Sequence, residues 1–356
     1  MENKNKKWLF GLVLLVVLLA GEFFWGIKLF RFKFKKEIAQ APAPAQVESA
    51  QIKAPQPQLD TVAYDKKLQE IANNPVVASS STSTIATLWP VKTIYPNGGA
   101  LLPFNRIVAY YGNLYSKGMG VLGEYPEDVM LDKLNGEVKK WQDADPSTPV
   151  IPALHYIAVV AQAGPSKTGK YIARMPDSQI DRVLEMAKKI NGIVFLDVQV
   201  GQSNVQTEVP LLEKYLKLPN VHLGIDPEFA TGNKRPGTVI GTLDASDVNF
   251  AANYLAKIVQ DNNLPPKILI VHRFTQPMVT NYQNITPLPE VQIVMDMDGF
   301  GSQGSKLNTY KQYIYKQPVQ FTGFKLFYKN DLARGPMFTP EQLLKLTPIP
   351  SYIQYQ

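Results

Sequence analysis

Val221–Phe229, VHLGIDPEF, predicts a strand whose carboxyl end presents two carboxylates. Residues two apart on a strand share a face. One face of this stretch is apolar and suits packing against helices, since it carries Val221, Leu223 and Ile225. The opposite face becomes acidic toward its end, with His222, Gly224, Asp226 and Glu228. In a barrel of alternating strands and helices that end carries the active site. The alternative is a turn that starts at Asp226 before Pro227, with Glu228 solvated.

Six further runs have the composition of buried strands and are separated by helical patterns. They cover 106–111, 150–160, 192–200, 267–272, 291–297 and 320–328. Seven strands in regular alternation predict an α/β fold of the TIM-barrel-like (β/α)8 type. The eighth strand is not obvious. Either Val91–Tyr95 supplies it or the barrel is incomplete, and a doubly wound open sheet is the alternative. No Gly-x-Gly-x-x-Gly follows a strand, so a dinucleotide site is not predicted.

The intervening helices follow from apolar residues at helical spacing and from their first turns. Three long helices are expected at 126–141, 176–190 and 246–262. Shorter helices fit at 207–217, 277–283, 306–316 and 340–346, and Asp60–Asn73 could form one more short helix.

The amino-terminal residues 1–36 predict a cytoplasmic tip and a membrane anchor. Trp8–Ile27 is an apolar run with Glu22 as its only charge, and about 20 such residues cross a bilayer as a helix. A cleaved signal peptide is the alternative. No lipobox cysteine follows Leu19–Gly21 and no clear cleavage site is present, so we favour an uncleaved signal anchor with the bulk of the chain outside the cell membrane.

Residues 37–88 are rich in Ala, Pro, Gln and Ser, a composition that predicts a disordered linker. The folded barrel-like domain is then expected at 89–356. The formal net charge of +7 is concentrated beside the apolar run. Basic residues at that place set the orientation of a membrane helix and attract anionic lipid headgroups. The charge therefore predicts no nucleic-acid partner. The chain has no cysteine, which excludes disulfides, thiolate metal sites and a cysteine nucleophile.

Polar residues recur on the inward face near the strand ends. Strands buried on both faces should be almost continuously apolar, so these departures predict a lined cavity. Each residue alone could be structural, but together they favour a site. The set comprises Asp197, Gln199, Asp226, Glu228, His272, Asp298 and Lys325, with Tyr110 and Tyr328 as candidate sugar-stacking platforms.

Two chemistries fit several carboxylates with one histidine and one lysine. The first is glycoside hydrolysis, with Glu228 as proton donor and Asp226 or Asp197 as its partner or nucleophile. Crowded carboxylates raise one another's pKa, as a proton donor at neutral pH requires. Gln199, His272, Asp298 and Lys325 would orient the substrate. The second is a divalent metal on Asp226, Glu228, His272 and Asp298. It is less favoured because the chain has only 3 His and no H-E-x-x-H pattern. No metal or other cofactor is therefore predicted.

Short blocks across residues 107–341 resemble a family of bacterial lipoproteins and membrane-anchored extracytoplasmic proteins. They include Leu196–Gln199, Ile225–Phe229, Val271–His272, Asp298–Gly301 and Gly323–Lys325. The chain departs from that family at His155, where the family has a carboxylate, and it lacks the lipobox cysteine. The resemblance implies a barrel-like α/β fold and an envelope location, and it implies no reaction.

These observations predict a membrane-anchored extracytoplasmic protein whose barrel acts on cell-envelope glycan by carboxylate acid/base catalysis. The alternative is a non-catalytic module that binds glycan or cell wall in the same cavity. Carboxylates that are all neutralised by cationic partners would favour that alternative. A purely structural envelope protein is the third possibility, and it would have aromatic side chains filling the barrel mouth.

Overall fold

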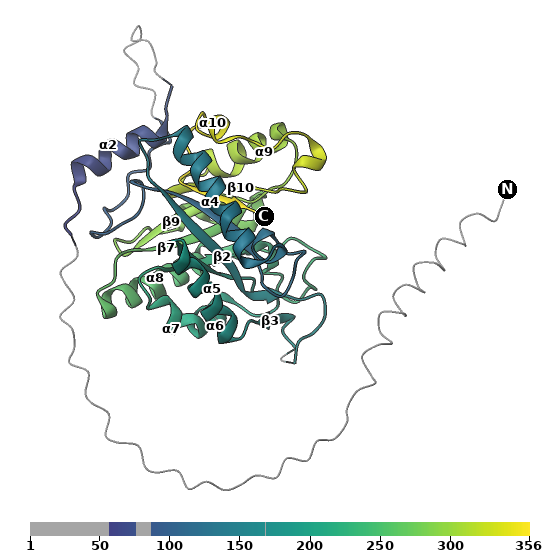
Figure 1. Ribbon diagram of the computed structural model, residues 1–356. Coiled ribbons are helices and arrows are strands. Elements are labelled where there is room, and N and C mark those ends of the chain that lie inside the picture. The colour runs from purple at the N-terminus through teal and green to yellow at the C-terminus, as the bar shows by residue number, and fades with distance from the viewer. Residues whose placement is uncertain (1–56, 76–86, 168) are drawn as a thin grey trace, which may run out of the picture. The chain divides into compact units, whose positions relative to one another are not determined.

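The computed structural model describes residues 57–75, 87–167 and 169–356, which form a closed barrel of parallel strands surrounded by helices (Figure 1). Eight strands pair in parallel around the ring in the order β1-β2-β4-β5-β7-β9-β10-β11, and β11 returns to β1. Their bounds are Arg106–Gly112 (β1), Val150–Ala161 (β2), Ile193–Val198 (β4), Val221–Ile225 (β5), Lys267–Arg273 (β7), Val291–Met297 (β9), Phe321–Leu326 (β10) and Tyr352–Tyr355 (β11). The fold is therefore a (β/α)8 barrel.

The closing strand is β11, a segment that the sequence analysis did not select. Val91–Tyr95, the candidate named there, forms no strand. Strand β11 has only 4 residues and follows a Pro-containing segment, so its own pattern is too short to be recognised. It is a strand because β1 and β10 supply hydrogen-bonding partners on both sides. The same closure excludes a doubly wound open sheet.

Three long helices cover the outside of the barrel, as their apolar spacing predicts. They are α4 (Glu127–Ala144), α5 (Asp177–Lys189) and α8 (Ala245–Asn262). Their buried residues pack with outward-facing strand residues such as Leu196 and Leu223. Helix α8 begins with a capping box between Asp244 and Asp247, which satisfies backbone N–H groups at its amino end.

The shorter connections differ in detail from the predicted helices. The helix predicted at 207–217 is divided into α6 (Val205–Glu208), η1 (Val209–Leu212) and α7 (Glu213–Leu216). The helix predicted at 306–316 forms α9 (Gln303–Thr309) and a π-helix, η5 (Tyr310–Tyr315). The helix expected at 277–283 is wrong. Two 3-10 turns, η3 (Gln276–Met278) and η4 (Tyr282–Asn284), flank strand β8 (Val279–Thr280) there. Asn281 lies in the left-handed region, with φ 53°, and a helix cannot pass through it.

The remaining elements are small. Helix α3 (Val121–Glu124) follows β1, and β3 (Ile172–Arg174) pairs antiparallel with β2. Strand β6 (Leu243–Asp244) pairs with β8. The other short helical turns are η2 (Pro227–Phe229), η6 (Leu332–Arg334) and α10 (Pro340–Leu343).

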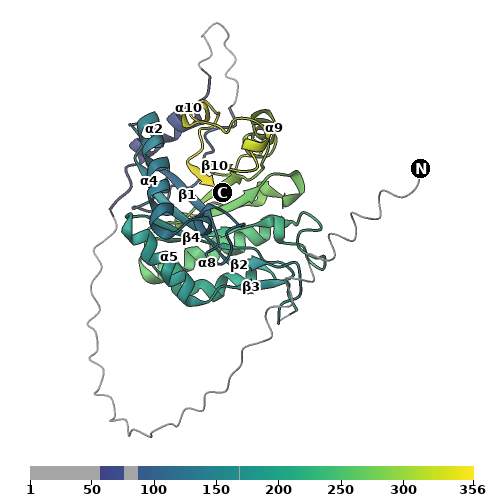
Figure 2. The ribbon, with the colours of Figure 1, turned by 45° about the vertical axis from the view of Figure 1, so that its right-hand side comes forward.

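Helix α2 (Thr61–Ala72) closes the amino-terminal end of the barrel, although it lies inside the stretch assigned to a linker. Asp60 caps it, and its Tyr64 packs with Leu102, Ile107 and other interior residues. The backbone N–H of Ile349 donates to the carbonyl of Ile71 over 2.7 Å, and Figures 1 and 2 show α2 beside α10. The folded unit thus starts before residue 89, because a helix with an apolar face can be buried even within a polar stretch.

The predicted membrane span Trp8–Ile27 and most of the predicted linker lie outside the described residues. No helix within 57–75, 87–167 and 169–356 is long and apolar enough to cross a membrane.

Candidate active site

A pocket of about 680 Å³ opens at the carboxyl ends of the barrel strands. This is the end at which barrel enzymes carry their chemistry. Aromatic side chains line the pocket without filling it, which argues against a closed barrel mouth. Its charged residues are Asp226, Glu228, Asp298 and Lys325, and its aromatic residues are Tyr111, Phe229, Phe274, Phe300 and Phe327.

Asp226 and Glu228 come from the turn after β5. The strand ends at Ile225, and the Oδ1 atom of Asp226 accepts a hydrogen bond from the backbone N–H of Glu228 over 3.1 Å. The predicted extended i, i+2 arrangement is therefore wrong, because Pro227 starts the 3-10 turn η2. Burial raises the pKa of Asp226 well above its usual range. Burial, with the negative charge of Asp298 as the next cause, raises the pKa of Glu228 to about 7.

Asp298 and Lys325 form the ion pair of the pocket. The Nζ atom of Lys325 lies 2.9 Å from Oδ1 of Asp298 and 3.9 Å from the ring centroid of Tyr111. Burial disfavours the Asp298 carboxylate, but the nearby charges of Lys325 and His272 outweigh it and hold the pKa of Asp298 below its usual value. The pocket thus contains two carboxyls whose pKa is raised, Asp226 and Glu228, and one that is held as an anion, Asp298.

Asp197 and His272 lie in a fully buried layer that does not line the pocket. The Tyr111 hydroxyl donates to Oδ2 of Asp197 over 2.9 Å. The Nε2 atom of His272 lies 3.6 Å from Oδ1 of Asp197, and its Nδ1 atom lies 3.2 Å from Asp296 and 3.3 Å from Asp298. Since neither residue faces the pocket, the predicted role of Asp197 as nucleophile or partner and of His272 as substrate ligand does not fit this structure.

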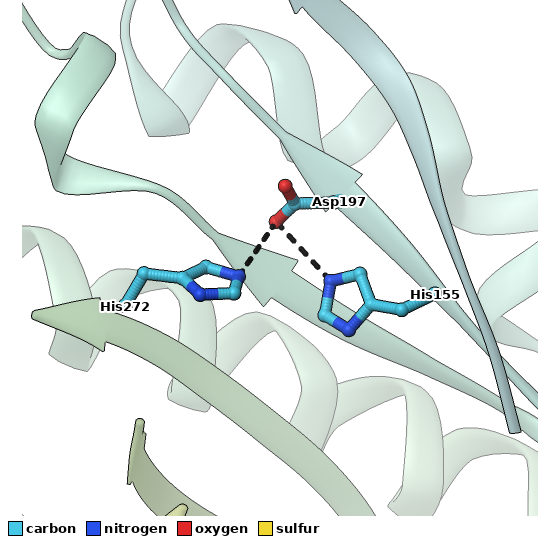
Figure 3. Close-up of side chains that lie close together, drawn as sticks. All are labelled: His155, Asp197 and His272. Atoms are coloured by element: carbon cyan, nitrogen blue, oxygen red, sulfur yellow. Dashed lines mark ion pairs between the residues drawn. The ribbon is translucent and has the colours of Figure 1, made fainter. Parts of the chain in front are cut away.

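His155 belongs to the same layer, and the sequence analysis gave it no role. Its Nε2 atom lies 3.5 Å from Oδ1 of Asp197, so both histidines approach one carboxylate oxygen (Figure 3). On its other side, Nδ1 lies 2.6 Å from the hydroxyl of Tyr352. The alternation along β2 could have identified His155, because Ala153, His155 and Ile157 share the inward face.

These surroundings act in opposite directions on the two histidines. Burial lowers the pKa of His155 to about 4. Burial also disfavours the charged form of His272. The carboxylates around it outweigh burial, with Asp197 having the largest effect, and raise the pKa of His272 well above its usual value. Burial raises the pKa of Asp296, the acidic neighbour of His272 that the sequence analysis did not name as a site residue.

Gln199 lines the pocket but is held by the protein on both sides. Its Nε2 atom donates to the Tyr111 hydroxyl over 3.2 Å and to Asp226 over 3.4 Å, while its Oε1 atom accepts from the backbone N–H of Ala161. It therefore fixes the positions of Tyr111 and Asp226 more than it offers groups to a ligand.

Tyr110 and Tyr328 lie outside the pocket, which contradicts their expected role as stacking platforms. Tyr110 is on the outward face of β1, and the two hydroxyls are 3.0 Å apart. The Tyr328 hydroxyl donates to Glu137 on α4 over 3.0 Å, and its ring stacks on Tyr355. The alternation of β1 instead turns Tyr111 inward.

The metal set considered from the sequence does not assemble as one group. Among the described residues, three potential ligand atoms lie within 4.8 Å of one another at His155, Asp197 and His272. That group excludes Asp226, Glu228 and Asp298, which surround the pocket above it.

Comparison with solved structures finds distant similarity to barrel enzymes. A 7,8-dihydropteroate synthase from Vibrio fischeri is 11% identical, with 75% of this chain and 92% of that chain covered and a TM-score of 0.36. A trimodular GH5_4 endoglucanase is 9% identical, with 72% and 56% covered and a TM-score of 0.40. A GH18 chitinase from Pseudoalteromonas aurantia is 11% identical, with 70% and 93% covered and a TM-score of 0.33.

No protein-family model and no curated protein matches the chain. The resemblance to envelope lipoproteins therefore stays a prediction, and similarity this distant says nothing about the reaction. The barrel itself is established by its strand pairing.

Proposed function

We propose that the barrel is a carbohydrate-directed hydrolase, with Glu228 as the proton donor and Asp298 as the ionised carboxylate. One observation carries this proposal. Two carboxyls of opposite protonation preference line one pocket, as acid/base catalysis of glycoside cleavage requires. The pKa of Glu228 is raised to about 7, whereas Asp298 is held as an anion in its ion pair with Lys325.

In this proposal Asp298 takes the place of Asp226 and Asp197, which the sequence analysis expected as the partner of Glu228. Asp197 lies below the pocket floor and is bonded to Tyr111. Asp226 lines the pocket, but burial favours its neutral form, and a neutral carboxyl is a poor nucleophile or electrostatic partner. Asp298 is left as the lining carboxylate with a cationic partner.

A sugar-sized ligand is supported by the lining of the pocket. Phe274, Phe300, Phe327 and Tyr111 offer apolar ring surface beside carboxylates, the amide of Asn330 and Lys325. Sites for small molecules combine such surfaces with a few polar groups that fix orientation. Among the described residues, Glu228 forms no ion pair with a cationic side chain, whereas a purely binding site would be expected to neutralise its carboxylates. We therefore favour hydrolysis over a non-catalytic glycan-binding module.

We also propose that the chain is anchored in the cell membrane by Trp8–Ile27 and acts outside it on envelope glycan. The support for this location is the apolar run and its flanking basic residues in the sequence. Fractionation of cells that express the full chain would test it, since the barrel should be found in the membrane fraction and be accessible to protease from outside.

The test of the reaction compares full-length protein and Glu228→Gln on a panel of envelope glycans. Loss of the proton donor should lower turnover by about 10²- to 10⁴-fold. The loss should be smaller on an aryl glycoside whose leaving group departs without protonation. Glu290→Gln is the matched control, because Glu290 precedes β9 at the opposite end of the barrel.

Each outcome decides between the alternatives. Cleavage by the wild type and the control but not by Glu228→Gln supports the hydrolase. Binding without cleavage by all three proteins identifies a recognition module. Equal cleavage by wild type and Glu228→Gln would show that another group donates the proton.

A further inference from the structure

Three buried side-chain atoms beneath the pocket face one another without a hydrogen-bond partner. They are Nε2 of His155, Nε2 of His272 and Oδ1 of Asp197. The two nitrogens lie 3.5 and 3.6 Å from that oxygen, and all three residues are 0% exposed. Buried polar atoms are almost always paired, so three unpaired atoms converging on one point require an explanation (Figure 3).

We propose that His155, Asp197 and His272 bind one divalent transition-metal ion, for which Zn²⁺ is the best-fitting candidate. Zinc takes nitrogen at 2.0–2.1 Å and carboxylate oxygen at about 2.0–2.2 Å. Tetrahedral ligands at such bond lengths are roughly 3.4 Å apart. The observed separations of 3.5 and 3.6 Å match that spacing with little movement.

The far side of each ligand is held in the orientation that metal binding needs. Nδ1 of His272 lies 3.2 Å from Asp296. A proton on this Nδ1 leaves the Nε2 lone pair free for a metal, and such partners typically orient metal-binding histidines. Nδ1 of His155 lies 2.6 Å from the Tyr352 hydroxyl and 3.1 Å from Nε2 of Gln354. Metal binding requires the tautomer of His155 in which Nδ1 donates to that hydroxyl. Oδ2 of Asp197 is likewise occupied by the Tyr111 hydroxyl, which leaves Oδ1 free.

Gly224 keeps space open beside these atoms. A Cβ atom at that position would lie 2.6 Å from Oδ1 of Asp197 and 2.6 Å from Nε2 of His155. Any other residue on this inward position of β5 would therefore occupy the space next to both ligands. The glycine provides a cradle at the point where the ion would lie.

The charges around the cluster also favour a cation. Asp296 is fully buried, and its ion-pair contact among the described residues is to Nδ1 of His272, an atom that it shares with Asp298. The ion pair from Lys325 goes to Asp298 alone. A buried carboxylate without compensation is costly, and a dication within the cluster would supply the missing positive charge.

A metal-free cluster of histidine and aspartate explains the geometry less well. Charge-assisted N–H···O bonds are about 2.7–2.9 Å long, and both contacts to Oδ1 of Asp197 are longer. Two imidazole nitrogens with one carboxylate favour Zn²⁺ or another transition ion over Mg²⁺ or Ca²⁺, which prefer oxygen. Since none of the three ligands lines the pocket, the ion would stabilise the pocket floor through Asp197 and Tyr111, and the proposal does not depend on the hydrolase.

The test measures metal content and stability of the untagged full-length chain in mild detergent. Elemental analysis after purification should give about one transition-metal ion per chain. Removal with a chelator should lower Tm, and Zn²⁺ at a hundredfold excess over its dissociation constant should raise it again by about 5–10 °C. Mg²⁺ and Ca²⁺ should have little effect. Co²⁺ in place of Zn²⁺ should give visible absorption bands typical of nitrogen and oxygen coordination.

His155→Gln and Asp197→Asn should abolish both the bound ion and the Zn²⁺-dependent rise in Tm. His222→Gln is the matched control, because His222 is the third histidine of the chain and is buried in the same barrel. It accepts a hydrogen bond from the backbone N–H of Ile268 and lies outside the cluster, so this variant should keep the ion.

Two results would overturn the proposal. One is wild-type protein that contains no stoichiometric metal and whose Tm does not respond to Zn²⁺. The other is unchanged binding in His155→Gln and Asp197→Asn, which would place the ion elsewhere. If these variants fail to fold, the wild-type comparison of Zn²⁺ with Mg²⁺ and the Co²⁺ spectrum still decide the question.

Discussion

The Tyr111 hydroxyl donates a 2.9 Å hydrogen bond to Oδ2 of Asp197 and so connects the pocket floor to the buried histidines. Tyr111 lines the pocket, and Asp197 contacts His155 and His272 below it. The same hydroxyl accepts from Gln199, which also contacts Asp226. One hydrogen-bond network therefore reaches from the pocket carboxyls to the barrel core.

Tyr111→Phe should destabilise the protein by about 1–3 kcal/mol, because it leaves a buried carboxylate oxygen without a donor. Urea unfolding followed by circular dichroism measures the change. Tyr115→Phe is the control, since that side chain is 64% exposed, and it should change stability by less than about 0.5 kcal/mol. Equal effects of the two substitutions would show that the bond to Asp197 contributes nothing.

Lys325→Met should cost about 3–5 kcal/mol, because it removes the partner of the buried Asp298 carboxylate. Adding Asp298→Asn in the same chain should recover part of that loss, since no unpaired charge then remains. The matched control is Lys139→Met. Its ion pair with Asp143 on α4 is exposed, and such pairs contribute about 0.3–0.5 kcal/mol. If the double variant were no more stable than Lys325→Met, the charge argument would fail.

The wild type should lose stability relative to Glu228→Gln as the pH rises from about 4.5 to above 7. The pKa of Glu228 is raised from 4.5 to about 7 in the folded chain. The folded state therefore binds more protons than the unfolded state in that interval, and its stability falls with increasing pH. The expected decline is about 2–3 kcal/mol, with allowance for partial solvent exposure.

Urea unfolding of both proteins at several pH values gives the difference in free energy directly, because all other titrating groups are shared. A flat difference across this interval would contradict the raised pKa. If the proposed reaction is correct, turnover should also fall as the pH rises above about 7, where the proton donor becomes ionised.

Tyr64→Ala should destabilise the barrel by about 3 kcal/mol or more, because it removes a buried ring from the cluster beneath the barrel. Tyr64 is 2% exposed and lies edge-to-face against Phe104. Val62→Ala on the same helix is the control, since Val62 is 79% exposed. Thermal unfolding of the full chain measures both, and equal Tm values would mean that α2 is not part of the folded unit.

Local periodicity determined much of this protein. Alternation of apolar and polar residues is a property of a strand by itself, so the inward positions of Asp197, Asp226, His272, Asp298 and Lys325 could be predicted. The outward packing of Leu196 and Leu223 followed from the same rule. The three long helices could be predicted from their own spacing in the same way.

Tertiary structure decided what these residues do. The four-residue strand β11 is defined by its partners β1 and β10, and it brings Tyr352 to His155. The stagger of the closed barrel sets the height of each inward residue, so Asp197 and His272 are buried below the pocket while Asp298 and Lys325 line it. Burial and neighbouring charge, which arise only in the folded chain, then separate the protonation of Glu228 from that of Asp298.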